Sequence, residues 1–128
     1  MNSFHRVQTL AEVAANALKG AALGYELKDF LHEFKESPGF ARLVKSPPDL
    51  AGHLPEGAVY DAFLQALAVF LSAQIRHAPP KWTQPPKMLA HPWFASPGAA
   101  MRNYLLISSP APFRARNLFV DEDSLQVV

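Results

Sequence analysis

The residues with the best chemistry for binding lie in a short arginine-rich segment near the C-terminus. Arg114 and Arg116 alternate with Phe113 and Ala115, and Asn117 follows them. Residues i and i+2 of a helix are about 200° apart, so we expect one arginine to point inward and the other to point to solvent. Guanidinium groups suit phosphates, carboxylates and aromatic faces.

Two interpretations of this segment are open. Together with Arg102, the two arginines and Asn117 form a candidate site for an anion or for an acidic partner. Alternatively, Arg114 or Arg116 pairs internally with the acidic run 121–123, or caps carbonyl groups of the proline-rich segment that precedes it. The internal role is the favoured interpretation.

A second set of candidate binding residues, Trp82, His91 and Trp93, lies within that proline-rich segment. An imidazole packed against the Trp93 ring is favoured over a catalytic base at His91. The five histidines form no HExxH pair, and none has the close spacing to other ligands that a metal site needs. We therefore expect neither a metal nor a cofactor.

The motifs of the common enzyme classes are not recognised in the chain. It has no cysteine, no GxSxG elbow around a serine and no glycine loop of the type that holds phosphates. We therefore favour a non-enzymatic interaction module whose partner is another protein. A small enzyme stays an alternative, with a site between the proline-rich segment and the long apolar helix that draws on His91, Arg102, Arg114 or Asp61.

Length and composition indicate one globular domain that covers residues 1–128. The chain is 49% hydrophobic and 18% charged, which is typical of a folded protein with a core of its own. The first residues lack the apolar centre of a secretory signal, and the absence of cysteine is compatible with a reducing compartment. We expect a cytoplasmic protein.

Charge is distributed unevenly along the chain. No acidic residue lies between Asp61 and Asp121, whereas six lysines and arginines do. Such asymmetry is one mark of a surface for nucleic acid or anions, here the segment 76–116. The favoured explanation is that these basic residues face the acidic half of the chain or are simply solvated.

The element expected to position these residues is a long apolar helix over about 57–77. Its apolar residues occupy most of the helix circumference, which is typical of a buried central helix. The longest uncharged run, 62–75, is short of the ~20 residues that a membrane span requires, so we expect no membrane contact. Asp61 and Gln65 interrupt the apolar pattern, and we expect them to mark a strip that the other helices leave uncovered.

Capping signals predict further helices on both sides of this one. Thr9 and Glu12 have the spacing of a capping box, so the first helix begins at Ser3 or Thr9 and ends near Lys19. Local patterns also predict a helix over 23–34, a short helical turn at 40–45, and helices over 98–107 and 110–116 with Ser109 as N-cap. The run 118–120 is either a strand or a helix end, and 121–125 is a final capped turn. Pro55 and Glu56 suit the first turn of the central helix, and Arg76 with His77 suit its end.

The proline-rich segment is predicted to be an extended strap over 78–97. Six of the twelve prolines lie in it, and large apolar residues such as Trp82, Met88 and Trp93 are interleaved with them as anchors. One helical turn is expected at 86–90. The predicted fold is therefore all-α, with four to six helices around the central helix and a Pro/Trp-rich strap across them.

The C-terminal half also resembles a known group of proteins. PKWT at 80–83, HPWF at 91–94 and SPxxFRxRNLFV at 109–120 are similar in order and spacing to a family of small uncharacterised bacterial proteins. Their genes lie beside those of nucleotidyltransferase-like or toxin–antitoxin-type partners. The resemblance implies an antitoxin-like or regulatory partner of a second bacterial protein, and it transfers no catalytic residue.

Overall fold

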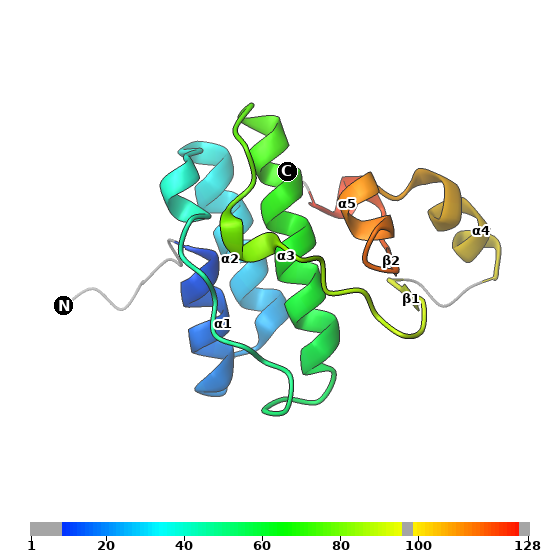
Figure 1. Cartoon of the computed structure of the whole chain (residues 1–128), viewed down its shortest axis with the longest axis horizontal. Helices are drawn as coiled ribbons and strands as arrows, with labels where there is room; N and C mark the ends of the chain where they lie inside the picture. Colours follow the sequence, from blue (N-terminus) through cyan, green and yellow to red (C-terminus); the bar gives the residue numbers. More distant parts are fainter. Residues whose placement is uncertain (1–8, 96–98, 126–128) are drawn as a thin grey trace.

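Helix α3, which runs from Gly57 to Gln74, is the central element of the computed structural model (Figure 1). The structure describes residues 9–95 and 99–125, apart from some side chains in the second range, that of Arg102 included. The helix buries apolar side chains along its length, among them Leu64, Leu67 and Leu71, and others such as Phe63 are half-buried. The prediction of a buried central helix is confirmed.

Helix α3 begins at the predicted residue, Gly57, but ends earlier than predicted, and two residues expected in its first turn lie before it. Pro55 and Glu56 precede the helix, and Glu56 is its N-cap with a φ of 59°. A Cβ at Gly57 would overlap the carbonyl group of Leu50, so the preceding loop passes directly over the first turn. At the other end the helix stops at Gln74, before the predicted 77, because Arg76 adopts a φ of 56°, in the left-handed region.

Helices α1 (Leu10–Leu18) and α2 (Leu23–Glu36) form an antiparallel pair beside α3 (Figure 1). The hydroxyl of Thr9 accepts a hydrogen bond from the Glu12 N–H at 3.1 Å, which confirms the predicted N-cap. The alternative start at Ser3 lies outside the described residues. The paired helices and α3 share one core of large side chains, which includes Leu10, Val13, Phe30, Phe34, Leu64 and Leu67.

The strap follows α3 as predicted, but its helical turn lies earlier in the chain than the predicted turn at 86–90. A 3-10 turn, η2, covers Lys81–Thr83, whereas residues 86–90 form no helical turn. The predicted turn at 86–90 is wrong because the backbone donors there have distant partners. The Lys87 N–H donates to Gln65 Oε1 at 2.9 Å, and the Leu89 N–H donates to the Arg116 carbonyl at 3.1 Å.

The C-terminal quarter forms a small unit on one side of α3. After the strand β1 (Trp93–Phe94) come helix α4 (Ala99–Ser108), helix α5 (Ala111–Arg114), strand β2 (Leu118–Phe119) and the 3-10 turn η3 (Glu122–Leu125). The two strands pair in parallel, with Trp93 opposite Leu118. Phe113 carries α5 onto α3, with its ring centroid 5.2 Å from that of Phe63.

One detail of this unit corrects the sequence prediction, and another settles an alternative that the sequence left open. Pro110, not Ser109, is the N-cap of α5, because the Ser109 hydroxyl instead donates to the Leu105 carbonyl and accepts from the Val120 N–H. The run at 118–120 contributes a strand, since residues 118 and 119 pair with β1. Ser109 therefore joins the end of α4 to the end of β2.

The fold class is all-α, as predicted. The described residues contain five α-helices, and the only sheet among them has two strands of two residues each. Helix α4 stands to one side and mainly contacts β2, whereas α5 lies against α3 (Figure 1). Within the described ranges, no helix combines the length and the apolar character that crossing a membrane would demand.

Candidate functional site

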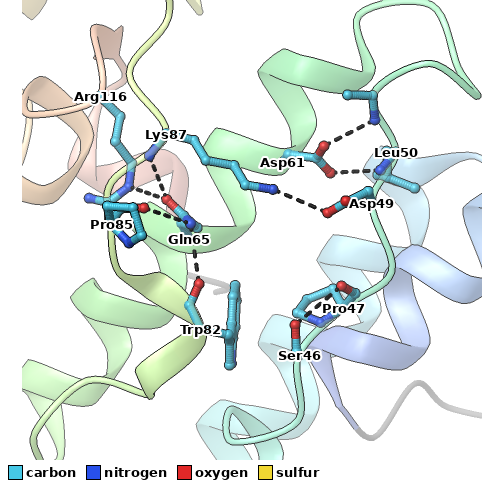
Figure 2. A network of polar contacts seen from close by, with 11 residues as sticks. Ser46, Pro47, Asp49, Leu50, Asp61, Gln65, Trp82, Pro85, Lys87 and Arg116 are labelled. Carbon is cyan, nitrogen blue, oxygen red and sulfur yellow. Dashed lines mark hydrogen bonds and ion pairs between the residues drawn. The ribbon is translucent and has the colours of Figure 1, made fainter.

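The side chain of Gln65 is the centre of a buried polar junction beneath the strap (Figure 2). Its amide nitrogen donates to the carbonyls of Trp82 at 3.2 Å and Pro85 at 3.4 Å. Its amide oxygen accepts from the Lys87 N–H at 2.9 Å and from Arg116 Nε at 3.1 Å. Both donors and both acceptor positions of the amide are therefore occupied, and the residue is only 3% exposed.

Arg116 completes the junction from the other side. It is 2% exposed, and burial lowers the pKa of its guanidinium group. Besides Gln65, it donates through Nη1 to the Pro112 carbonyl at 2.9 Å and through Nη2 to the Thr83 carbonyl at 3.0 Å. All three nitrogens thus bind neutral oxygens, and one of these belongs to the strap. This arrangement is the internal role favoured from the sequence, and Arg114 is the exposed member of the pair.

Asp61, one turn before Gln65 on α3, holds a second extended segment. Its two carboxylate oxygens accept hydrogen bonds from the N–H groups of Leu50 at 2.8 Å and Ala51 at 3.0 Å. The expectation that Asp61 and Gln65 mark an uncovered strip is wrong, because both residues are buried. Extended segments cover this strip, since their free backbone groups need polar partners that an apolar helix face lacks.

A small cavity lies between the strap and α3, where the alternative interpretation of the sequence places an enzyme site. It has a volume of about 40 Å³ and is lined by Asp49, Asp61, Gln65, Trp82 and Lys87, among others. Lys87 Nζ and Asp49 Oδ1 form an ion pair of 3.2 Å at its exposed edge. Sites for small-molecule ligands typically measure about 300–1,000 Å³, so this space suits a few water molecules.

The structure uses the other predicted binding residues in the strap in different ways. Trp82 is half-buried, and its indole N–H donates to the Leu43 carbonyl at 2.8 Å. Trp93 lies in β1, and its backbone N–H donates to the backbone carbonyl of Asn117. The side-chain amide of Asn117 in turn donates to the Leu89 carbonyl. His91 is exposed. These residues therefore do not converge on one cavity.

Arg102 lies in α4, and its side chain is outside the described part of the structure. Sequence reasoning missed Gln65 and Thr83 as members of the junction. The available signal was the polar character of Gln65 in an otherwise apolar helix. Nothing local pointed to Thr83, which contributes only a backbone carbonyl to Arg116.

Helix α4 carries the most apolar exposed surface of the C-terminal unit. Met101, Tyr104 and Leu106 are 42%, 50% and 47% exposed, whereas Leu105 between them is buried against the rest of the unit. Surface helices normally place such residues on one covered stripe. The uncovered apolar side chains on α4 are therefore a candidate interaction surface, distinct from the buried junction.

No family model, no curated protein and no solved structure matches the chain. The resemblance to small bacterial proteins therefore stays a prediction. Among the residues that the structure describes, no three histidine or acidic side chains gather in a way that would hold a metal ion.

Proposed function

We propose that this protein is a non-enzymatic interaction module that binds a second protein through α4, as a small regulatory or antitoxin-like subunit would. The observation that carries the proposal is the mismatch between the composition of α4 and its burial. Seven of its ten residues are apolar, yet of its described large apolar side chains only Leu105 is buried. A helix apolar around its whole circumference is normally covered on several sides.

The energetics favour a covered α4. Full burial of a large apolar side chain contributes about 1.5–3 kcal/mol, so the exposed halves of Met101, Tyr104 and Leu106 leave about 1 kcal/mol each to be gained on binding. Exposed apolar patches on proteins commonly mark sites of protein–protein contact, and Met101 and Tyr104, three positions apart, share one face of α4. A second protein that covers α4 would recover this free energy.

The scaffold around α4 supports the same role. In the chain, α4 lies between β1 and α5. Strand β1 pairs with β2, and α5 packs on α3 through the contact of Phe113 with Phe63. Ser109 ties the end of α4 to β2 through the Val120 N–H. Meanwhile Gln65 and Arg116 are occupied with holding the strap. The buried polar side chains thus serve to present α4 on a fixed support.

The two alternative functions have less support. For nucleic-acid binding, the segment 76–116 would have to act without Arg116, which is buried, and with Lys87 already paired to Asp49. For an enzyme, the space between the strap and α3 measures only about 40 Å³. The interaction module therefore remains the function that we propose.

The test uses co-expression of the tagged chain with the product of the neighbouring gene. We expect the wild type to retain this product, and Tyr104→Asp or Leu106→Asp to lose it, because a carboxylate on α4 would be desolvated on binding. Tyr25→Asp is the matched control, since Tyr25 is an exposed aromatic residue on α2. Equal retention by all variants, or no retention by the wild type, would contradict the proposal.

A further inference from the structure

A continuous series of hydrogen bonds leads from the central helix to α4 by way of the strap. It starts at Gln65, whose amide oxygen accepts a hydrogen bond from Arg116. The backbone carbonyl of Arg116 in turn accepts from the Leu89 N–H at 3.1 Å, and the Leu89 carbonyl accepts from the side-chain amide of Asn117 at 3.1 Å. Both backbone groups of Leu89 are therefore held by two consecutive residues of the C-terminal unit.

The series continues from Asn117 to the last turn of α4. The Asn117 carbonyl accepts from the Trp93 N–H at 3.0 Å, where β1 lies beside β2. Val120, directly after β2, donates its N–H to the Ser109 hydroxyl at 3.0 Å, and this hydroxyl donates to the Leu105 carbonyl. The strap and the end of α4 are thus attached to the same short stretch of chain around β2.

Asn117 is the residue at which the series turns from the strap toward β2. Its φ of 67° lies in the left-handed region, which asparagine tolerates better than most residues. The residue lies between α5 and β2, and it binds the strap twice, through its side-chain amide at Leu89 and through its carbonyl at Trp93. A change in the position of the strap therefore acts directly on the start of β2.

Helix α4 has few other attachments within the part of the chain that the structure describes. Leu105 is the one buried member of its described large apolar side chains, and β2 is its main packing partner. Its ten residues are also fewer than the about 12–15 that an isolated helix needs for even marginal stability in water. The stability of α4 therefore depends on how firmly β2 and Ser109 are held.

We infer that the strap couples the central helix to α4. The clamp of Gln65 and Arg116 fixes Leu89 and the stretch around β2, and this stretch fixes the last turn of α4 through Ser109. Contiguous hydrogen-bond networks can carry such coupling between distant sites. On the basis of the proposed function, the coupling is reciprocal: a protein bound to α4 would protect the strap, and release of the strap would weaken binding.

A second route from α3 to α4 runs through apolar packing. Phe113 of α5 lies against Phe63 and Phe70 of α3, with ring centroids 5.2 Å and 6.2 Å apart, and Pro110 and Ser109 connect α5 to α4 along the chain. If this packing alone supported α4, a change in the polar series would leave the helix unaffected. The two routes therefore predict different behaviour of α4 when the clamp is weakened.

Amide hydrogen exchange of the full chain, followed by mass spectrometry, separates the two routes. Arg116→Lys should accelerate exchange roughly tenfold in the strap and in α4, the factor expected when a charged donor loses a hydrogen bond. Ser109→Ala should accelerate exchange in α4 but leave the strap near its wild-type rate, because it breaks only the last link. Arg114→Lys is the exposed control and should change neither segment.

The double variant Arg116→Lys/Ser109→Ala shows whether the clamp acts through Ser109. If it does, the loss of Ser109 already disconnects the clamp, so α4 should exchange no faster in the double variant than in Ser109→Ala alone. Factors that multiply, or an unchanged exchange rate of α4 in Arg116→Lys, would overturn the inference and leave the packing of Phe113 as the support of α4. If Arg116→Lys does not fold, Asn117→Gly interrupts the same series at Leu89 and keeps the left-handed backbone, with the same expected outcomes.

Failure of this inference is distinguishable from failure of the proposed function. Hydrogen exchange is measured on the chain without a partner, whereas the proposed function is tested by retention of the neighbouring gene's product. When both hold, Arg116→Lys should also reduce that retention, because part of the binding free energy is then used to order α4. If α4 responds to the clamp but the wild-type chain retains no product, the coupling stands and the proposed function alone fails.

Discussion

Gln65 and Arg116 are joined by a buried hydrogen bond of 3.1 Å between residues that lie 51 positions apart in the chain. Each of them also binds backbone carbonyl groups of the strap, Gln65 at Trp82 and Pro85, and Arg116 at Thr83. The strap is thus clamped between the central helix and the C-terminal unit.

Gln65→Leu should destabilise the protein by about 3–5 kcal/mol. The change leaves two carbonyls, the Lys87 N–H and one donor of the buried Arg116 without partners, and each orphaned group costs about 1–3 kcal/mol before relaxation. Urea unfolding measures the effect. Gln74→Leu, on the exposed surface of the same helix, is the control and should change the free energy of unfolding by less than about 0.5 kcal/mol. Similar values for both variants would show that the junction does not hold the strap.

Arg116→Lys should cost about 2 kcal/mol although it keeps the positive charge. The guanidinium fork reaches three oxygens on Gln65, Pro112 and Thr83, and a lysine ammonium does not reproduce this planar geometry. Arg114→Lys provides the exposed control and should be close to neutral. Thermal unfolding followed by circular dichroism distinguishes the two, and a neutral Arg116→Lys would contradict the role of the fork.

Asp61→Asn should destabilise by about 1–2 kcal/mol. Both carboxylate oxygens accept backbone N–H groups, and an amide would turn an NH₂ donor toward one of them. Asp49→Asn removes only an exposed ion pair with Lys87 and should cost at most about 1 kcal/mol. Proteolysis of the loop at 46–55 offers a second readout, since it should accelerate in Asp61→Asn alone. Equal rates of proteolysis in both variants would contradict the role of Asp61 in holding this loop.

Gly57→Ala and Gly24→Ala should have effects of opposite sign. A Cβ at Gly57 would overlap the Leu50 carbonyl, and overpacking of this kind costs about 1–3 kcal/mol. A Cβ at Gly24, within α2, would meet nothing within 4 Å, so alanine should stabilise the helix by about 0.5–1 kcal/mol. The midpoint of urea unfolding gives both signs in one experiment, and a stabilising Gly57→Ala would refute the close approach of the loop.

Local sequence patterns are sufficient to predict the α-helices and the central place of α3. These features depend on local rules, because caps such as Thr9 and the 3.6-residue periodicity of apolar side chains act over a few positions. The i, i+2 spacing of Arg114 and Arg116 likewise predicted that the two would point in different directions. The C-terminal end of α3 was predicted less well, since Arg76 adopts a left-handed φ of 56° that the local sequence does not indicate.

The partners of the buried polar side chains, and the exposure of α4, depend instead on how distant parts of the chain pack together. Apart from the local bond of Arg116 to Pro112, the partners of Asp61, Gln65 and Arg116 lie from 10 to 51 positions away. No spacing rule exists for such distant pairs. The same holds for α4. Its apolar composition is evident in the sequence, but whether neighbouring elements cover Tyr104 and Leu106 depends on how the chain packs in three dimensions.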